Sequence, residues 1–210
     1  ETINKIYKEY QDLCSRDNLV DFGELLLRAY EVVKNNERVR EFFHTRFQSI
    51  LVDEFQDTNT IQYQWLLEIA SDTASITAVG DDDQSIYGWR GAKVENVDSF
   101  TKTFEDTEII RLEQNYRSTN IILGAANALI ENNTERLGKN LWTEQLEGEP
   151  IVLYQAYNEQ DEARFVADIL KDWMSSGELY SDAAVLYRSN AQSRAVEEAL
   201  LRTSIPYRIY

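Results

Sequence analysis

Two adjacent carboxylates follow a short apolar run in the first half of the chain: Ile50-Leu51-Val52 leads directly into Asp53 and Glu54. A buried parallel strand that ends in acids has the geometry of a ligand site, because ligands of open α/β sheets bind beyond the carboxyl ends of the strands. Asp53 can hold Mg²⁺ through water, and Glu54 can orient or deprotonate an attacking water. A solvated acidic turn has the same local pattern, but the extension Phe55-Gln56-Asp57-Thr58-Asn59 makes the catalytic interpretation more specific.

A second polar loop, residues 80–91, follows the apolar run 76–79. Its Gln84 can hydrogen-bond a γ-phosphate without adding charge. Tyr87 and Trp89 offer flat faces for unpaired bases, a contact worth about 1–3 kcal/mol per base. An isolated tryptophan more often packs in a core, yet a polar, glycine-flanked loop favours exposure. One loop that touches both nucleotide and DNA strand would couple the two.

A third segment, residues 113–118, lies where a first α/β unit is expected to give way to a second. Arg117 is placed there to neutralise charge on a transferred phosphoryl group, as an arginine finger does. Tyr116 can stack on adenine. The alternative is a surface arginine at a helix start, where positive charge is mildly unfavourable, and this slightly favours the functional interpretation.

Apolar runs that alternate with helical patterns predict an α/β fold with a parallel sheet and flanking helices. The expected strands are 50–52, 76–79, 108–112, 151–154, 183–187 and 207–210. The expected helices lie within 1–47 and at 58–70, 96–104, 118–131, 160–174 and 192–201. Thr58 or Asn59 is suited to capping one helix and Ser118 another, and a loop is expected at 132–150. The chain begins within a predicted helix without methionine and ends in a predicted strand, so we expect a piece of a longer protein.

The charge balance constrains how the chain can meet DNA. The 210 residues carry a net charge of −16, which repels nucleic acid at long range. Any DNA contact must therefore be local, through stacking, backbone amides and a few arginines. His44 is the only histidine, so it supports no metal cluster or histidine triad.

Other compositional features indicate a cytoplasmic protein with no membrane partner. The single cysteine, Cys14, excludes an internal disulfide and fits a reducing compartment. No apolar run approaches the roughly 20 residues that span a bilayer, and no signal segment opens the chain.

Together the three segments resemble the UvrD/Rep/PcrA group of superfamily 1A DNA helicases, close to its bacterial helicase II branch. The most specific are residues 52–59, 79–92 and 112–118, which follow one another in the family's order. The resemblance covers nearly the whole chain, from Asp21-Phe22-Gly23-Glu24-Leu25-Leu26 to Pro206-Tyr207-Arg208-Ile209-Tyr210. It implies a RecA-like P-loop NTPase helicase core, incomplete at both ends. The domains implied are the end of an inserted helical subdomain (1–15), part of a first RecA-like domain (16–115) and part of a second (116–210).

The resemblance also implies roles for individual residues. Asp53 corresponds to the Mg²⁺ ligand, Glu54 to the catalytic base and Gln84 to the γ-phosphate sensor. Tyr116 corresponds to the residue that stacks on adenine, and Arg117 to the finger. The implied DNA contacts are Tyr87, Trp89, Arg90, Arg188 and Asn190.

The implied activity of the whole protein is ATP-dependent, 3′-to-5′ movement on single-stranded DNA with unwinding of the duplex. The cofactors are ATP and Mg²⁺. The partners are single-stranded DNA, duplex junctions and DNA-repair proteins, because branches of the family serve excision and mismatch repair.

One departure from the family is the missing Gly-rich loop that cradles phosphates. Its nearest match, Gly138-Lys139, is followed by Asn140, and Asn133 stands where the loop needs a glycine. We therefore expect this chain alone not to hydrolyse ATP. The alternatives are a non-catalytic DNA- or protein-binding module, a helicase–nuclease subunit of the same superfamily, and a protein-remodelling NTPase, against which Tyr87 and Trp89 argue.

Overall fold

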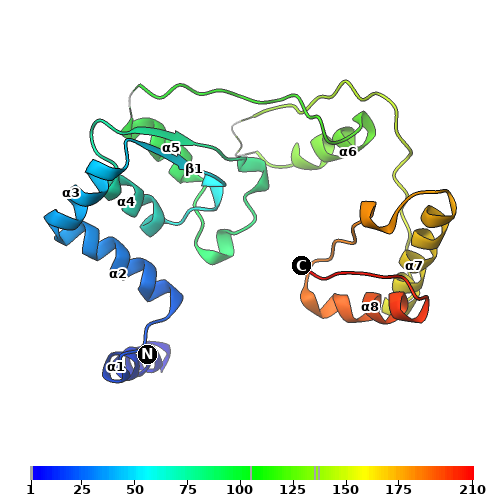
Figure 1. The fold of residues 1–210 in the computed structure, drawn as a ribbon, viewed down its shortest axis with the longest axis horizontal. Helices are drawn as coiled ribbons and strands as arrows, with labels where there is room; N and C mark the ends of the chain where they lie inside the picture. The colour runs from blue at the N-terminus through cyan, green and yellow to red at the C-terminus, as the bar shows by residue number, and fades with distance from the viewer. Residues whose placement is uncertain (1, 105, 135, 137) are drawn as a thin grey trace. The chain divides into compact units, whose positions relative to one another are not determined.

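The computed structural model describes residues 2–104, 106–134, 136 and 138–210 (Figure 1). The chain divides into two compact units, Glu1–Gly148 and Glu149–Tyr210. Each unit is described by itself below. The helicase-domain boundaries expected at residues 15/16 and 115/116 stay predictions.

Helices precede the sheet, as the sequence predicts: α1 (Thr2–Asp17), α2 (Phe22–Asn35) and α3 (Glu37–Arg46). Asp21 caps α2 by accepting a hydrogen bond from the Glu24 N–H at 2.8 Å, and it also accepts one from the Tyr10 hydroxyl at 2.8 Å. These bonds lower the pKa of the Asp21 carboxyl, and the cap fixes where α2 begins. None of the helices within the described residues is long and apolar enough to cross a membrane.

The sheet consists of two parallel strands, β1 (Ser49–Val52) and β2 (Ser75–Ala78), which confirms the first two predicted strands. Val52 lies opposite Ala78 in this register. The pairing extends past the strands, because the Val79 N–H donates to the Val52 carbonyl at 2.8 Å and the Phe55 N–H to the Val79 carbonyl at 2.9 Å. The carboxyl ends of both strands therefore meet at one edge.

Helix α4 (Thr60–Ile69) connects β1 to β2, as expected for parallel strands. Asn59 caps it, and the Gln62 side chain bonds back to the Asn59 N–H to complete a capping box. The prediction that Thr58 or Asn59 would cap this helix is therefore confirmed for Asn59. The cap fixes the point where the strand-end turn passes into the helix.

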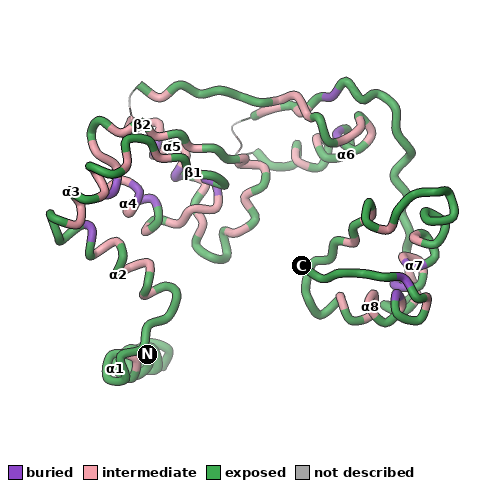
Figure 2. Tube along the Cα trace, viewed as in Figure 1, coloured by how far each residue is buried: buried purple, intermediate pink, exposed green. Residues whose placement is uncertain are grey.

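The core of the first unit forms between α2, α4, the turn after β1 and α5 (Glu95–Thr103) (Figure 2). Its buried members are Val33, Phe55, Tyr63, Leu66, Ile69 and Phe100. The Phe55 ring meets the Phe100 ring edge-on at 5.5 Å between centroids. Phe55 thus anchors the turn that follows the two carboxylates.

The same unit continues with α6 (Asn120–Ile130), which begins two residues later than Ser118. Thr119 holds the cap position without a side-chain capping bond, so Ser118 as the capping residue is wrong. Ser118 instead donates its own N–H to the Asn115 side chain at 2.7 Å, within the turn before the helix.

The second unit is built on α7 (Glu159–Ser175) and α8 (Ser193–Arg202), both close to their predicted positions. Its small core consists of Ala167, Leu200 and Ile205. Asn158 caps α7 by accepting a hydrogen bond from the Asp161 N–H at 2.9 Å. The two helices pack against each other around Ala167 and Leu200.

Four predicted strands, 108–112, 151–154, 183–187 and 207–210, are not strands in the structure. Their apolar side chains are largely exposed, as Leu153 at 95% illustrates. An apolar, β-branched pattern favours extended backbone, but a strand also needs a neighbour that pairs with its N–H and C=O groups. Among the described residues the sheet therefore has two strands, and the fold is α/β with fewer strands than expected.

Candidate functional site

Asp53 and Glu54 both lie exposed at the carboxyl end of β1. Glu54 has left-handed backbone angles, φ 50° and ψ 46°, which are uncommon for a residue with a side chain and store strain. Its N–H donates to Asp53 Oδ1 at 3.0 Å. The reversal turns Phe55 into the core while both carboxylates stay at the surface.

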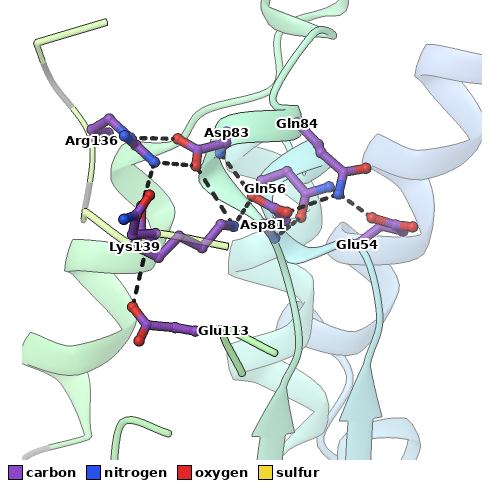
Figure 3. A network of polar contacts seen from close by, with 9 residues as sticks. Glu54, Gln56, Asp81, Asp83, Gln84, Glu113, Arg136 and Lys139 are labelled. Carbon is purple, nitrogen blue, oxygen red and sulfur yellow. Dashed lines mark hydrogen bonds and ion pairs between the residues drawn. The ribbon is translucent and has the colours of Figure 1, made fainter. Parts of the chain in front are cut away.

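Gln56, which the sequence interpretation missed, is the most deeply buried polar side chain described, with 1% of its surface exposed. Its Nε2 donates to Glu54 Oε2 at 2.7 Å, and its Oε1 accepts from the Asp81 N–H at 2.9 Å (Figure 3). One amide thus uses a donor and an acceptor to join the turns after β1 and β2. The available signal was a neutral amide between acids, but its burial follows only from the pairing of the strands.

Gly80 makes this bridge possible. A Cβ added at Gly80 would lie 2.7 Å from Gln56 Oε1 and 3.3 Å from the Gln56 nitrogen. Real Cβ atoms do not approach an oxygen to 2.7 Å, so a side chain at position 80 would displace the Gln56 amide from its bond to the Asp81 N–H. The glycine after β2 serves close approach of two backbones.

The short turn Asp82–Gln84 after β2 carries Gln84, the predicted γ-phosphate sensor. Asp81 begins this turn and accepts the Asp83 N–H at 3.0 Å through Oδ1. Its Oδ2 accepts from Gln84 Nε2 at 2.8 Å. Gln84 is exposed, so its amide lies at the surface beside the strand ends, held through Asp81.

Arg136 and Lys139 come from the segment after α6 and contact the same turn (Figure 3). Arg136 is bidentate, with Nε 2.8 Å from Asp83 Oδ1 and Nη2 2.6 Å from Asp83 Oδ2. Lys139 pairs with Asp81, and its Nζ lies 3.8 Å from Asp83 Oδ2. We call these two basic residues with Asp81 and Asp83 the charge clamp.

The clamp determines the electrostatics of the acidic turn. Burial raises the pKa of the Asp81 carboxyl, but hydrogen bonds from Lys139 and Gln84 outweigh it, and the pKa lies below its ordinary value. Carboxylate oxygens of Asp81, Asp82 and Asp83 lie within 4.8 Å of one another, a grouping that could hold a cation. Arg136 and Lys139 supply the compensating positive charge here.

Tyr87, Trp89 and Arg90 lie together further along the loop, and we call them the platform. Trp89 is 73% exposed, and its ring centroid lies 6.5 Å from that of Tyr87. The Arg90 guanidinium lies over both rings, 4.8 Å from the Tyr87 centroid and 4.6 Å from that of Trp89. The expectation that these aromatics avoid the core is confirmed for Trp89, whereas Tyr87 is half-buried.

The far end of this loop returns to the turn after β1. Ala92 forms an isolated antiparallel bridge with Asn59, and the Lys93 N–H donates to the Thr58 carbonyl at 3.0 Å. The buried Asn96 side chain donates to the same carbonyl at 2.9 Å. Both ends of the loop are therefore fastened to the segment that begins with Asp53.

The backbone of the segment Glu113–Ser118 is paired with Trp142: the Asn115 N–H donates to the Trp142 carbonyl at 2.7 Å, and the Trp142 N–H donates to the Glu113 carbonyl at 3.1 Å. Asn115 Oδ1 accepts the Arg117 N–H at 2.9 Å. Tyr116 is 76% exposed and donates its hydroxyl hydrogen to Gln114 at 2.8 Å. Among the described residues, no hydrogen bond or ion pair joins Arg117 to Glu54 or Gln84. The structure brings Asp53, Glu54 and Gln84 to one edge, whereas within the described part of the chain Tyr116 and Arg117 bond to none of these three side chains.

Arg188 and Asn190 belong to the second unit, and both are exposed. The turn Asn190–Gln192 is capped by Ser189, whose N–H donates to the Gln192 side chain at 3.0 Å. The Asn190 carbonyl accepts from the Ser193 hydroxyl at 2.9 Å. Both side chains are available for a ligand, and their role as DNA contacts stays a prediction.

Comparison with known families gives two matches. A model described as the UvrD/REP helicase N-terminal domain matches residues 1–105. A second, described as the UvrD-like helicase C-terminal domain, matches residues 110–210. Together they cover nearly the whole chain.

Curated relatives are similar over the same length. The chain is 60% identical over 210 residues to DNA helicase II of Escherichia coli (strain K12), covering 100% of this chain and 29% of that protein. It is 59% identical over 206 residues to DNA helicase II of Haemophilus influenzae, covering 98% and 28%. It is 44% identical over 207 residues to the ATP-dependent DNA helicase PcrA of Staphylococcus aureus (strain Mu50), covering 99% and 28%. The chain thus spans under a third of the length of these relatives.

Proposed function

The chain belongs to the UvrD/Rep helicase family, and we propose that the whole protein is an ATP-dependent DNA helicase. It would couple ATP hydrolysis to movement on single-stranded DNA and to unwinding of the duplex. The observation that carries the proposal is one loop, residues 80–92. This loop holds Gln84 beside the carboxylates at one end and presents Trp89 further along, and both its ends are fastened to the turn after Asp53.

The strand-end carboxylates supply the hydrolytic half of this function. Asp53 suits Mg²⁺, because its carboxylate is exposed at the strand end and Mg²⁺ favours one or two carboxylates with phosphate oxygens. When bound, Mg²⁺ neutralises charge that develops on the phosphates. Glu54 would orient and deprotonate the attacking water. Its carboxylate is held for this task by the Gln56 amide at 2.7 Å.

Three further residues would act on the nucleotide. Gln84 would hydrogen-bond the γ-phosphate and so detect its presence. Tyr116 would stack on adenine, and Arg117 would neutralise the transferred phosphoryl group. The exposure of Tyr116 and Arg117 supports roles in which each contacts a ligand.

DNA would be bound through local contacts, because the net charge of −16 opposes long-range attraction. Tyr87, Trp89 and Arg90 would bind unpaired bases by stacking and through the arginine charge. Arg188 and Asn190 would extend this track. The whole protein would have a RecA-like core and a cytoplasmic location. Its partners would be duplex junctions and DNA-repair proteins.

This chain by itself would not hydrolyse ATP. It has no Gly-rich loop with Lys and Thr to cradle phosphates, and Lys139, the nearest candidate, is paired with Asp81. Purified chain should show no Mg²⁺-dependent ATP hydrolysis above a Glu54→Gln control. Hydrolysis that Glu54→Gln abolishes would contradict this proposal.

The coupling is tested by ATP hydrolysis of the whole protein with and without single-stranded DNA. DNA should stimulate the rate, and Trp89→Ala should weaken single-strand affinity by about 1–3 kcal/mol. The matched control is Trp142→Ala, which alters a tryptophan outside this loop. Unchanged affinity in Trp89→Ala would contradict the assignment of the platform and favour a function without nucleic acid.

A non-catalytic binding module of the same ancestry is the second candidate, because the exposed Trp89 can stack on an unpaired base without ATP. Such a module would bind single-stranded DNA through the same platform, without ATP. Single-strand affinity that does not respond to ATP and Mg²⁺ in the whole protein would support this module over the helicase.

A further inference from the structure

The charge clamp joins two parts of the chain that are far apart in sequence. Arg136 reaches Asp83 across 53 positions, and Lys139 reaches Asp81 across 58. We propose that Arg136 and Lys139 are positioning residues, whose ion pairs hold the turn that carries Gln84 in the arrangement needed for ATP hydrolysis. This inference rests on the proposed function and adds to it residues that touch neither nucleotide nor DNA.

The clamp differs from the other ion pairs of the described residues in its burial. The Arg136 and Asp83 side chains are 17% and 13% exposed, and those of Lys139 and Asp81 are 17% and 23% exposed. By contrast, the Arg194 side chain is 87% exposed beside Glu198. Exposed pairs contribute little, whereas removing one partner of a shielded pair leaves an uncompensated charge. The clamp therefore has a structural effect that surface pairs lack.

Asp81 transmits this effect to Gln84. Its N–H is held by Gln56 at 2.9 Å, and its Oδ2 holds Gln84 Nε2 at 2.8 Å. Lys139 bonds the other carboxylate oxygen, Oδ1. With the Asp83 N–H, which also donates to Oδ1, four contacts fix Asp81. Asp81 thereby links the two basic residues of the clamp to Gln84, the predicted γ-phosphate sensor.

Arg136 also bonds to the backbone of its own segment. Its Nη2 donates to the Lys139 carbonyl at 2.9 Å in addition to Asp83. The arginine therefore orders the backbone that carries Lys139, so the two basic residues act as one unit. The Asn140 N–H adds a contact to Glu113 at 3.3 Å.

A basic residue in a DNA-binding protein would ordinarily be assigned to the DNA backbone. The geometry argues against that role for Arg136, because two of its nitrogens are committed to the Asp83 carboxylate in bidentate form. A phosphate would have to displace a shielded, charge-assisted pair. Only a measurement that separates positioning from phosphate contact can decide between these roles.

The test is a double-mutant cycle in the whole protein with Arg136→Ala, Asp83→Ala and both together. Each single change should lower the kcat of DNA-stimulated ATP hydrolysis about tenfold, which corresponds to the loss of one anchoring bond. The double variant should fall no further than the single ones, since both remove the same contact. In all three variants, the slope of log affinity for single-stranded DNA against log salt concentration should stay unchanged.

Arg28→Ala is the matched control, because Arg28 is an exposed arginine paired with Glu24 and Glu31 on α2. Its kcat should stay within about twofold of the unaltered protein. Arg136→Lys keeps the charge without the bidentate geometry. If the alanine variants do not fold, Arg136→Lys and Asp83→Asn, alone and together, make a second double-mutant cycle with smaller changes. This cycle is then used to distinguish positioning from phosphate contact.

Losses that multiply in the double variant would overturn the inference. So would a salt slope that falls by about 0.7 in Arg136→Ala, the value for one lost phosphate contact on a single strand. An unaltered protein whose ATP hydrolysis is not stimulated by DNA would overturn the proposed function and this inference with it. Multiplying losses in a stimulated protein overturn the inference alone.

Discussion

The loop after β2 and the segment Glu113–Ser118 are both predicted to act on the nucleotide, but the structure holds them differently. The loop is fastened by Gln56 at its start, by the charge clamp along its acidic turn and by Thr58 and Asn59 at its end. The segment is held through its backbone, by bonds to Trp142 and Gln145 as well as by the local bonds to Asn115. In the loop the Gln84 side chain is itself held by Asp81, whereas in the segment the side chains of Tyr116 and Arg117 are exposed.

The largest effect should come from the exposed side chains of the segment Glu113–Ser118. Arg117→Ala in the whole protein should lower kcat about 10³- to 10⁵-fold if Arg117 is the finger. The fold should be unaffected, because the exposed side chain makes no ion pair among the described residues. Steady-state ATP hydrolysis with DNA measures the loss.

The matched control is Arg111→Ala, an exposed arginine six positions earlier. Its kcat should not change. Equal, small effects of Arg111→Ala and Arg117→Ala would show that neither arginine reaches the phosphates.

A change at the start of the loop after β2 should instead lower the free energy of unfolding. Gln56→Ala removes both bonds of a buried amide and leaves the Asp81 N–H without its acceptor. The expected cost is about 1–3 kcal/mol, seen as a lower midpoint of thermal unfolding. Gln64→Ala, which alters an exposed glutamine on α4, should cost less than about 0.5 kcal/mol. Equal midpoints for these two variants would argue that the Gln56 bridge does not hold the turns together.

The smallest expected effect is a pH dependence of the clamp. The pKa of the Asp81 carboxyl is lower when folded than the ordinary value of about 4. Ionised Asp81 therefore stabilises the fold at neutral pH, and this contribution is lost as the pH falls through the folded-state pKa.

Unfolding should be followed from pH 7 to pH 3 for the unaltered protein and for Asp81→Asn. The difference between them should be on the order of 1 kcal/mol at neutral pH and shrink in acid. Asp72→Asn, at an exposed aspartate, is the control. A stability difference between the unaltered protein and Asp81→Asn that grows in acid would contradict a lowered pKa for Asp81.

Local patterns predicted the parts of the fold that depend on neighbouring residues. Strands β1 and β2 were predicted because apolar runs that end in Asp53 and Gly80 carry their own signal. The segment 108–112 carries a similar signal, yet a strand also needs a partner, and its Leu112 is exposed. Propensity specifies extended backbone, whereas pairing depends on the rest of the molecule.

The site was predicted to a similar extent. The sequence interpretation named Asp53, Glu54 and Gln84, whose types and spacing suggest chemistry directly. Gln56 was missed because its burial exists only once β1 pairs with β2. Lys139 was considered only as part of a phosphate loop and rejected, because Asn140 follows it and Asn133 stands where the loop needs a glycine. Its pairing with Asp81 was not predicted, because it spans 58 positions and leaves no local pattern.

In the proposed function, the carboxylates after β1 drive ATP hydrolysis, and the loop of residues 80–92 links them to DNA. The most direct test is Glu54→Gln in the whole protein, assayed for ATP hydrolysis with saturating single-stranded DNA and for DNA affinity. We expect kcat to fall by about 10²- to 10⁴-fold, whereas affinity for single-stranded DNA is retained. A Glu54→Gln protein that hydrolyses ATP at the unaltered rate would contradict the proposed function.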